Sequence, residues 1–375
     1  MKVGVPRETV PGERRVALVP EAVAKLTKGG TEVVVESGAG LGSGHDDAAY
    51  RTAGATIADR AAAFAADLVV KVQKPSTEEV GLLREGAALI ATLQPLTNAE
   101  LVRALAARRT TSLSMDAIPR VTRAQPMDSL SSQSNIAGYK AVLMAANALP
   151  KFFPMLTTAA GTVTPARVLV LGAGVAGLQA IATARRLGAV VEAFDTRPVV
   201  KEQVQSLGAR FLEIDLGEQG EGTGGYAKEL SEEAHRKEVE LVGKHVKDAD
   251  VVITTALVPG RRAPILVTTD MIRSMRPGSV IVDLAAEMGG NAELTQSGKT
   301  VVENGVTIIG EVNLPSTLSV HASQLYSRNV SALLGHLMKD GKLALDMNDE
   351  ITKGSVITQD GAVVHEATKK AMGQA

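Results

Sequence analysis

The sequence predicts an α/β protein made of two doubly wound domains with a cleft between them. The chain has 375 residues, more than one hydrophobic core usually organises. Short apolar runs, typical of buried parallel strands, alternate with helical patterns along most of its length. One stretch, Ala166–Arg197, has the pattern of strand, glycine turn, helix and strand in close succession. Together these observations favour sheets with helices on both faces.

The first part of the chain has the patterns of one such domain. Strands are predicted at Lys2–Val5, Glu32–Glu36, Leu68–Val72, Ala88–Leu93 and Thr111–Met115. Helices are predicted at Pro20–Leu26, Asp47–Ala66 and Asn98–Ala107. The glycine-rich residues 37–47 lack the spacing of a phosphate-binding turn and are interpreted as a loop. Arg14 and Arg15 follow Gly12 in an early loop and face either a cleft or solvent.

A long irregular stretch follows, between Ile118 and Ser134. Its sequence, PRVTRAQPMDSLSSQ, has two prolines and neither helical nor strand periodicity. Long irregular loops in compact domains are often functional, so this central loop, Pro119–Gln133, is a candidate site. Ser132 is expected to cap the helix that runs to Ala148 and links the first domain to the second.

Three glycines follow the strand Val168–Leu171 in the G-x-G-x-x-G spacing that opens a dinucleotide-binding helix. Gly172 allows the turn, Gly174 lets a pyrophosphate approach bare backbone, and Gly177 lets the helix lie close to the strand. The phosphates are expected at the helix start, where free N–H groups and the helix dipole favour an anion. The helix is expected to end at Gly188.

A second strand, Val190–Phe194, delivers Asp195, which lies 18 residues past Gly177. A Rossmann unit places at about this distance the acid that binds the adenosine ribose hydroxyls. A carboxylate there repels a 2′-phosphate, so it favours NAD over NADP, although Arg197 weakens that preference. The sequence therefore predicts a Rossmann-like domain that binds NAD(H) through the glycine turn and Asp195.

The remaining patterns complete the second domain and return the chain to the first. Strands are predicted at Arg210–Ile214, Val251–Thr255, Ser279–Leu284 and Val306–Ile309, with a charged helix at Ala227–Val246. A helix at Val320–Met338 is expected to lead back to the first domain, followed by a hairpin around Asp360-Gly361. The predicted domains are 1–131 with 320–375, also Rossmann-like, and 132–319, which binds NAD(H).

The composition excludes several classes of function. Lys and Arg number 40 against 41 Asp and Glu, so the charge gives no basis for nucleic-acid binding. Without cysteine the chain has no disulfide, thiol nucleophile or cysteine metal site, and no metal site is predicted. The start, MKVGVPRE, lacks the apolar core of a signal peptide, and no apolar run approaches 18 residues. We therefore expect a cytoplasmic protein that does not span a membrane.

These motifs resemble the soluble NAD(H)-binding component of proton-translocating nicotinamide nucleotide transhydrogenases. The resemblance covers nearly the whole chain and rests on the glycine turn and on PRETVPGERRVALVP, PRVTRAQPMDSLSSQSNIAGYKAV, GGYAKE, TTALVPG and GSVIVDLAAEMGGN. It implies hydride transfer from NADH in the cleft to NADP(H) held on a separate subunit, coupled to proton translocation through a membrane-spanning subunit. It also implies a homodimer that is attached peripherally to the inner membrane through partner subunits.

The resemblance also assigns roles to residues. In that family the central loop reaches over the nicotinamide, which implies catalytic roles for Arg120, Gln125 and Asp128. The further cofactor contacts that it implies are Pro126, Met127, Ser131, Gly172, Ala173, Gly174, Val175, Gly177, Asp195, Thr196, Arg197, Gly225, Tyr226 and Leu257. Tyr226 is expected at the tip of a mobile loop. Glu238 departs from the glutamine that the family pattern has near the adenosine.

Alanine dehydrogenase is a second enzyme family that the sequence resembles, through the ERRVAL opening and the two-domain pattern. Imine chemistry needs a titrating acid/base, and a keto-acid carboxylate needs cations. That family has a lysine and a histidine where this chain has Gln73 and Gln94, and an aspartate where it has Glu287. A register slip would let Lys71 or Lys74 replace the lysine, so this alternative stays open. A third interpretation is a non-catalytic NAD-sensing module, which needs the glycine turn but not the central loop.

Overall fold

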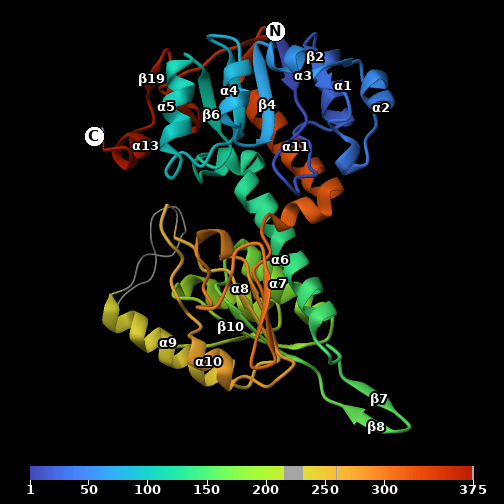
Figure 1. Cartoon of the computed structure of the whole chain (residues 1–375), viewed down its shortest axis with the longest axis vertical. Helices are drawn as coiled ribbons and strands as arrows, with labels where there is room; N and C mark the ends of the chain where they lie inside the picture. The colour runs from blue at the N-terminus through green and yellow to red at the C-terminus, as the bar shows by residue number, and fades with distance from the viewer. Residues whose placement is uncertain (215–230, 259, 374–375) are drawn as a thin grey trace. The chain divides into compact units, whose positions relative to one another are not determined.

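The computed structural model describes residues 1–214, 231–258 and 260–373, which form two compact units. The first unit consists of Met1–Gln133 and Ser316–Ala375, and the second of Ser134–Pro315. Each unit is built on one largely parallel sheet with helices on both faces (Figure 1). The predicted fold class, an α/β protein with two doubly wound domains, is confirmed, and the cleft between them stays a prediction.

The sheet of the first unit is formed by β1 (Lys2–Val5), β2 (Glu32–Glu36), β3 (Thr56–Ala58), β4 (Leu68–Gln73), β5 (Ala88–Thr92), β6 (Thr111–Ser114), β18 (Val356–Gln359) and β19 (Ala362–Val363). Its strand order is β19-β18-β6-β5-β4-β1-β2-β3. Within this order, the strands β6-β5-β4-β1-β2-β3 are all parallel, which is the arrangement of a doubly wound sheet. β18 and β19 extend that sheet as an antiparallel hairpin.

Helices cover both faces of this sheet. They are α1 (Pro20–Lys28), α2 (Asp47–Thr52), α3 (Arg60–Phe64), α4 (Thr77–Leu82), α5 (Ala99–Ala107), α11 (Ser319–Leu337), α12 (Glu350–Ser355) and α13 (Glu366–Ala371). The core on one face is formed with α1, α2 and α11, and the core on the other with α3, α4 and α5. A small hairpin of β16 (Met338–Lys339) and β17 (Lys342–Leu343) follows α11.

The sheet of the second unit is formed by β9 (Arg167–Leu171), β10 (Val190–Phe194), β11 (Arg210–Phe211), β12 (Val251–Thr254), β13 (Val280–Asp283), β14 (Thr300–Glu303) and β15 (Val306–Ile309). Its order is β11-β10-β9-β12-β13-β15-β14, and among these strands only β14 is antiparallel. A separate hairpin of β7 (Leu156–Thr158) and β8 (Gly161–Val163) stands away from the sheet (Figure 1).

The two faces of the second sheet carry different helices. α6 (Ser129–Ala148), which begins in the first unit, packs on one face with α7 (Val175–Arg186) and α8 (Lys201–Ser206). The opposite face is covered by α9 (Glu232–Val246) and α10 (Thr269–Ser274). Alternate residues of the central strands enter the two cores, as Val168 and Leu169 do, which explains why these strands are apolar throughout.

Strand prediction succeeds where an apolar run is bounded by turn residues. β1, β2, β10 and β15 have the predicted bounds. The C-terminal hairpin is also confirmed: Asp360 has a φ of 51° and Gly361 a φ of 86°, as a two-residue hairpin turn requires.

The prediction of one helix over Asp47–Ala66 is wrong. α2 ends at Thr52, and Gly54 follows with a φ of 89°, which a continuing helix cannot adopt. The next residues form β3, which pairs in parallel with β2. Asp59 then starts α3 by accepting a hydrogen bond from the N–H of Ala62 at 2.8 Å. The segment is a helix–strand–helix arrangement, and its alanine-rich composition led to the prediction of a single helix.

The expected cap at Ser132 is also wrong. α6 begins earlier, at Ser129, and the Oδ1 atom of Asp128 accepts the N–H of Ser131 at 2.9 Å, as an N-cap residue does. The predicted central loop contains a 3₁₀ turn, η2 (Thr122–Met127), directly before this cap. Short elements such as α4 and β14 were not predicted, because so few residues show no clear periodicity.

Within the described ranges, every helix is either too short or too polar to cross a membrane.

Replacing Gly4 with alanine is expected to destabilise the first unit. A Cβ atom at Gly4 in β1 would lie 1.9 Å from the carbonyl oxygen of Ala63, so α3 would have to move off the sheet. We expect a loss of about 1 to 3 kcal/mol in the free energy of unfolding, measured by chemical denaturation. Gly81→Ala in α4 is the matched control, because its Cβ meets nothing within 4 Å. Equal effects of the two substitutions would contradict this packing.

Candidate functional site

The strand order of the second unit fixes where a ligand can bind. The chain runs outward from β9 in both directions, to β10 on one side and to β12 on the other. In open α/β sheets the crevice for a ligand lies outside the carboxyl ends of the two strands at such a switch point. Gly172 follows β9, and Thr255 follows β12. The glycine turn that the sequence singled out therefore lies at the expected edge of the sheet.

The three glycines of the turn have different surroundings. Gly172 has a φ of 97°, and a Cβ atom at Gly177 would lie 1.8 Å from the carbonyl oxygen of Gly172. Both positions therefore need glycine for the fold itself. Gly174 is different, because the nearest atom to a Cβ there is Nη2 of Arg197 at 3.8 Å. This open backbone is what the approach of a pyrophosphate requires.

The start of α7 offers a place for a negative charge. Its N-cap is Gly174, which has no side chain to satisfy the first N–H groups of the helix. Val175 is the first helical residue, and the buried side of the helix carries Gly177, Ala180, Ile181 and Ala184. Small residues on that side allow α7 to lie close to the sheet. The helix start can therefore hold an anion with backbone N–H groups and the helix dipole.

The side chain of Asp195 makes several hydrogen bonds within the chain that the sequence did not indicate. Its Oδ2 atom accepts the N–H of Ala173 at 2.7 Å, which ties the end of β10 to the glycine turn. Arg197 binds the same carboxylate through its backbone N–H at 2.9 Å, Nε at 2.8 Å and Nη2 at 2.7 Å. Both side chains are largely buried, at 5% and 12% exposure. Arg197 therefore offsets part of the negative charge that was expected to repel a 2′-phosphate.

Thr196 lies between these two residues with an unsatisfied hydroxyl. Its Oγ1 atom is buried and has no hydrogen-bond partner in the described part of the chain. A buried hydroxyl without a partner costs free energy, so a ligand with hydroxyl groups would satisfy it. Together with the open backbone at Gly174, this orphaned atom fits a dinucleotide.

Two residues that the sequence did not single out shape the same edge. Thr255 donates its hydroxyl to the carbonyl oxygen of Gly172 at 3.0 Å. Asn291 is fully buried and binds Ala256 through both the N–H, at 3.0 Å, and the carbonyl oxygen, at 2.9 Å. Leu257, a predicted contact, is 40% exposed on the segment that Asn291 fixes. The signal in the sequence that could have indicated Asn291 is its position directly after the double glycine Gly289-Gly290.

Some predicted contacts cannot be placed or have other partners. Gly225 and Tyr226 lie outside the described residues. Glu238 is buried in α9 and is bound to Nδ1 of His235 at 2.9 Å. This hydrogen bond from His235 to Glu238 raises the pKa of the histidine despite its burial.

The central loop of the first unit presents its predicted residues in one turn. Ala124 and Met127 are buried and anchor η2, while Gln125 and Pro126 are exposed. Asp128 accepts the N–H of Ser131 at Oδ1 and the hydroxyl of Ser131 at Oδ2, at 2.9 Å and 2.5 Å. The predicted residues from 125 to 131 therefore lie in one continuous turn that leads into α6. Arg120 is exposed on the segment that precedes η2.

The two glutamines that distinguish this chain from the alanine dehydrogenase pattern are held in polar contacts. Gln73 donates Nε2 to Oε2 of Glu13 at 2.8 Å. Gln94 accepts a hydrogen bond from Nζ of Lys74 at 3.0 Å. Both side chains are amides, so neither exchanges a proton near neutral pH. Positions 73 and 94 therefore carry no group that titrates near neutral pH.

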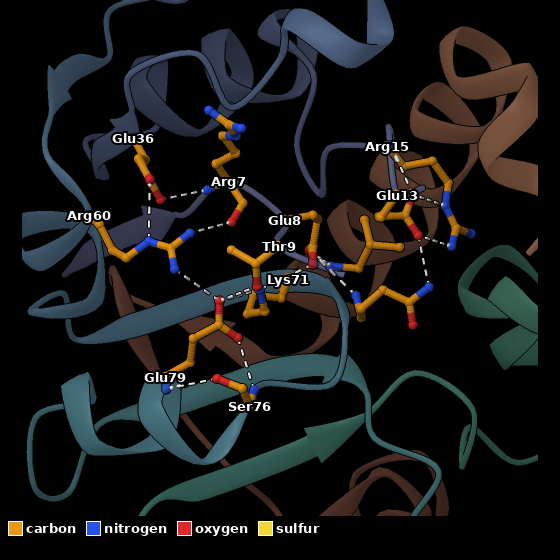
Figure 2. A network of polar contacts seen from close by, with 12 residues as sticks. Arg7, Glu8, Thr9, Glu13, Arg15, Glu36, Arg60, Lys71, Ser76 and Glu79 are labelled. Atoms are coloured by element: carbon orange, nitrogen blue, oxygen red, sulfur yellow. Dashed lines mark hydrogen bonds and ion pairs between the residues drawn. The ribbon is translucent and has the colours of Figure 1, made fainter. Parts of the chain in front are cut away.

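Lys71 is part of a buried ion-pair network (Figure 2). Its Nζ atom lies 3.1 Å from Glu8 and 3.3 Å from Glu79, and all three side chains are at most 3% exposed. Burial raises the pKa of Glu8, although Lys71 opposes this effect. An ammonium group held between two carboxylates is not available to bind a substrate. Lys71 is therefore a structural residue of the first unit.

Glu13 and Arg15 form a second ion pair in Figure 2, with Oε2 and Nη2 at 2.6 Å. Burial raises the pKa of Glu13, but hydrogen bonds and charge from Arg15, with a hydrogen bond from Gln73, hold it at about 2. Nη1 of Arg15 also reaches Oε1 of Gln133 at 2.9 Å. Arg15 is buried and paired, so it is not a solvated charge. Both Arg14 and Arg15 line a pocket of the first unit, as the prediction of arginines that face a cleft allowed.

Comparison with known proteins identifies matches along the whole chain. The family model "Alanine dehydrogenase/PNT, N-terminal domain" matches residues 4–137. The model "Alanine dehydrogenase/PNT, C-terminal domain" matches residues 141–366. The two matches together include both the central loop and the glycine turn.

Individual proteins are similar over nearly the full length. The chain is 51% identical to the first portion of the NAD(P) transhydrogenase alpha subunit of Rhodospirillum rubrum, over 98% of each chain. It is 32% identical to "Alanine dehydrogenase 2" of Staphylococcus aureus, over 100% of this chain and 99% of the other. The solved structure of a transhydrogenase from Sinorhizobium meliloti has a TM-score of 0.86 at 46% identity, covering 98% of this chain and 100% of that one.

Replacing Glu13 with glutamine is expected to lower stability most at neutral pH. Because the pKa of Glu13 is held at about 2, its ionised form contributes stability that is complete above 4.5 and is lost as the pH falls toward 2. Breaking this buried pair should cost about 3 kcal/mol near pH 7. The difference in unfolding free energy between wild type and E13Q should then shrink as the pH is lowered from 4.5.

Glu21→Gln is the matched control for this measurement. Glu21 pairs with Lys25 on the surface of α1, where both side chains are more than half exposed. Such pairs contribute little to stability, so E21Q should follow the wild type at every pH. A constant difference between E13Q and wild type across the acid range would contradict the role of the Glu13 charge.

Proposed function

The chain belongs to the alanine dehydrogenase/PNT family, and from this premise we propose that it is the NAD(H)-binding subunit of a proton-translocating transhydrogenase. The reaction is hydride transfer between NADH on this chain and NADP⁺ on a partner subunit, coupled to proton movement through a membrane subunit. Higher identity to the transhydrogenase subunit, 51% against 32% for the alanine dehydrogenase, favours this function over the dehydrogenase.

The observation that carries the proposal is the pair of amides at positions 73 and 94. Oxidation of an amino acid to a keto acid passes through an imine, whose formation and hydrolysis need a group that gains and loses a proton. Gln73 and Gln94 cannot do this, and Lys71 is enclosed by Glu8 and Glu79. The other lysine that a register slip would bring there, Lys74, donates its hydrogen bonds to the amides of Gln94 and Asn98. Direct transfer of a hydride between two nicotinamide rings needs no proton at either carbon. It needs positioning, which amides and backbone groups supply.

The residues that hold NADH fall into two groups. We assign the pyrophosphate to the start of α7, with Gly172, Ala173, Gly174, Val175 and Gly177, and the adenosine ribose to Asp195, Thr196 and Arg197. Leu257, Gly225 and Tyr226 are assigned to the same nucleotide. The orphaned Thr196 hydroxyl and the open Gly174 support these assignments.

The second group consists of central-loop residues, which we assign to the nicotinamide end. NADH supplies the hydride when it is bound. Gln125 offers an amide that can pair with the carboxamide of the ring, and Asp128 fixes the turn through Ser131. Arg120 supplies a cation that can tether a phosphate or the loop itself. Pro126 and Ser131 complete this surface, and Met127, also assigned to this end, anchors it with its buried side chain, so the loop orients the ring without exchanging protons with it.

The partners follow from the same function. We propose that the chain acts as a homodimer with an NADP(H)-binding subunit and a membrane-spanning subunit that conducts protons. Through these it would be attached peripherally to the cytoplasmic side of the inner membrane. The name of the Rhodospirillum rubrum relative describes a portion of one subunit, which supports an assembly with further chains.

Three assays on the purified chain test the function. With an NADP(H)-binding transhydrogenase subunit added, NADH should be oxidised as NADP⁺ is reduced, because the partner supplies the second ring. Alanine with NAD⁺ should give no NADH. NADH binding without either reaction would replace the proposal by a non-catalytic NAD-sensing module, and alanine-dependent reduction of NAD⁺ would replace it by a dehydrogenase.

The nucleotide preference is expected to depend on Arg197. Asp195 disfavours a 2′-phosphate, so NADH should bind more tightly than NADPH, as measured by calorimetry. Arg197→Ala should increase that preference, because it leaves the Asp195 carboxylate without its cation. Arg186→Ala, at the exposed C-terminal end of α7, is the control and should leave it unchanged. Equal affinities of the wild type for NADH and NADPH would contradict the assignment of Asp195.

A further inference from the structure

Asn329 joins the central loop to the buried helix α11. Its Nδ2 atom donates to the carbonyl oxygen of Pro126 at 2.8 Å, and its Oδ1 atom accepts the hydroxyl of Ser132 at 2.7 Å. Asn329 is 7% exposed. One amide therefore binds the residue that follows Gln125 on one side and the first turn of α6 on the other.

The C-terminal segment also binds the loop at a second point. Arg123 lies 2.9 Å from Asp349 and 3.3 Å from Glu350, at the start of α12. The hydrogen bond from Arg123, with others from Ile351, Thr352 and His336, holds the pKa of Asp349 far below its usual range. Gln125 thus lies between two anchored residues, Arg123 and Pro126, while its own side chain is exposed.

Asn329 is also the last member of a chain of hydrogen bonds that begins at the end of β4. Gln73 binds Glu13 at 2.8 Å, and Glu13 binds Arg15 at 2.6 Å. Arg15 binds Gln133 at 2.9 Å, and Gln133 reaches Ser132 at 3.3 Å. Ser132 then binds Asn329. The chain connects the early loop, the start of α6 and α11 to one carbonyl group of the central loop.

We propose that Asn329 is a positioning residue for hydride transfer: it fixes the carbonyl group of Pro126, the residue after Gln125, so that the exposed amide of Gln125 and the cap at Asp128 keep one orientation toward the nicotinamide. This inference rests on the proposed function. The position of reacting groups matters because a displacement of about 1 Å can cost a factor on the order of 100 in rate. The Pro126 carbonyl belongs to the peptide between Pro126 and Met127, so this hydrogen bond holds the turn directly after Gln125.

The amide of asparagine is the smallest side chain that meets both contacts. It has one donor group for Pro126 and one acceptor for Ser132. Aspartate has the same shape and keeps the acceptor, but its ionised form has no donor for the carbonyl oxygen, so the comparison is made at a pH at which this carboxyl group is ionised. Asn329→Asp therefore removes one of the two bonds and changes the volume of the buried site very little.

The test compares N329D with wild type in the full chain, combined with the NADP(H)-binding subunit. We expect the rate of hydride transfer to fall at least tenfold, while the dissociation constant of NADH stays within twofold. NADH affinity should be kept because the second unit holds the pyrophosphate and ribose. Ser331→Ala is the matched control, since its hydroxyl binds Ser327 within α11 itself and should affect neither quantity.

Hydrogen exchange of the free chain provides a second, independent readout. The amides of residues 122–128 should exchange faster in N329D than in wild type, and Gln125→Ala should leave that exchange unchanged while it lowers the transfer rate. Unchanged exchange, or faster exchange with an unchanged transfer rate, would overturn the role of Asn329. If N329D does not fold, Ser132→Ala removes the other bond of Asn329 and should give the same two changes in weaker form.

The two proposals can fail separately. If the wild type transfers no hydride with its partner, the proposed function fails, and hydrogen exchange still decides whether Asn329 orders the loop. If the wild type transfers hydride and N329D does so equally fast, only the positioning role fails.

Discussion

The first unit depends on a helix that comes from the other end of the chain. Buried backbone N–H groups need hydrogen-bond partners. Those of the early loop, which connects β1 to α1, bind side chains of α11 and of the turn before it. Ser316 accepts the N–H of Arg14 at 2.7 Å, while Ser323 and Ser327 accept those of Val16 and Val19, each at 3.1 Å. Tyr326 donates to the carbonyl oxygen of Lys71 at 2.8 Å. The early loop, the end of β4 and the central loop are therefore shaped by one helix.

The second unit holds its candidate site by a different principle. There the glycine turn depends on close backbone packing, because Gly177 lies against the carbonyl of Gly172 with no space for a side chain. Asp195 ties the next strand to the same turn through the N–H of Ala173. A turn fixed by its own backbone can expose N–H groups to a ligand without rearrangement. The first unit, in contrast, presents side chains whose orientation is set by long-range hydrogen bonds.

This contrast explains what could be predicted from the sequence. The glycine turn, β10 and Asp195 lie within about thirty residues, and each has a local signal that chain geometry translates directly into structure. The contacts of Asn329 with Pro126, of Gln133 with Arg15 and of Glu13 with Gln73 join residues that are 203, 118 and 60 positions apart, so no local pattern reveals them. The pairing of Arg197 with Asp195 was missed for another reason: the sequence shows two charges but not which way they face. Alanine-rich composition led to the prediction of a helix through β3, whereas Gly54, with its positive φ, marks the end of the preceding helix.

The buried network around Lys71 separates structural charges of the first unit from the neighbouring amides at positions 73 and 94. Lys71, Glu8 and Glu79 satisfy one another inside the first unit, so this set is part of its framework. Removing one member would leave an uncompensated buried charge, which is costly, whereas exchanging a titrating side chain for an amide at position 73 or 94 is not. In this chain Gln73 uses its amide to bind Glu13, the first step toward Asn329 and the central loop. The position that would hold a proton donor in a dehydrogenase is here part of the framework that orients the loop.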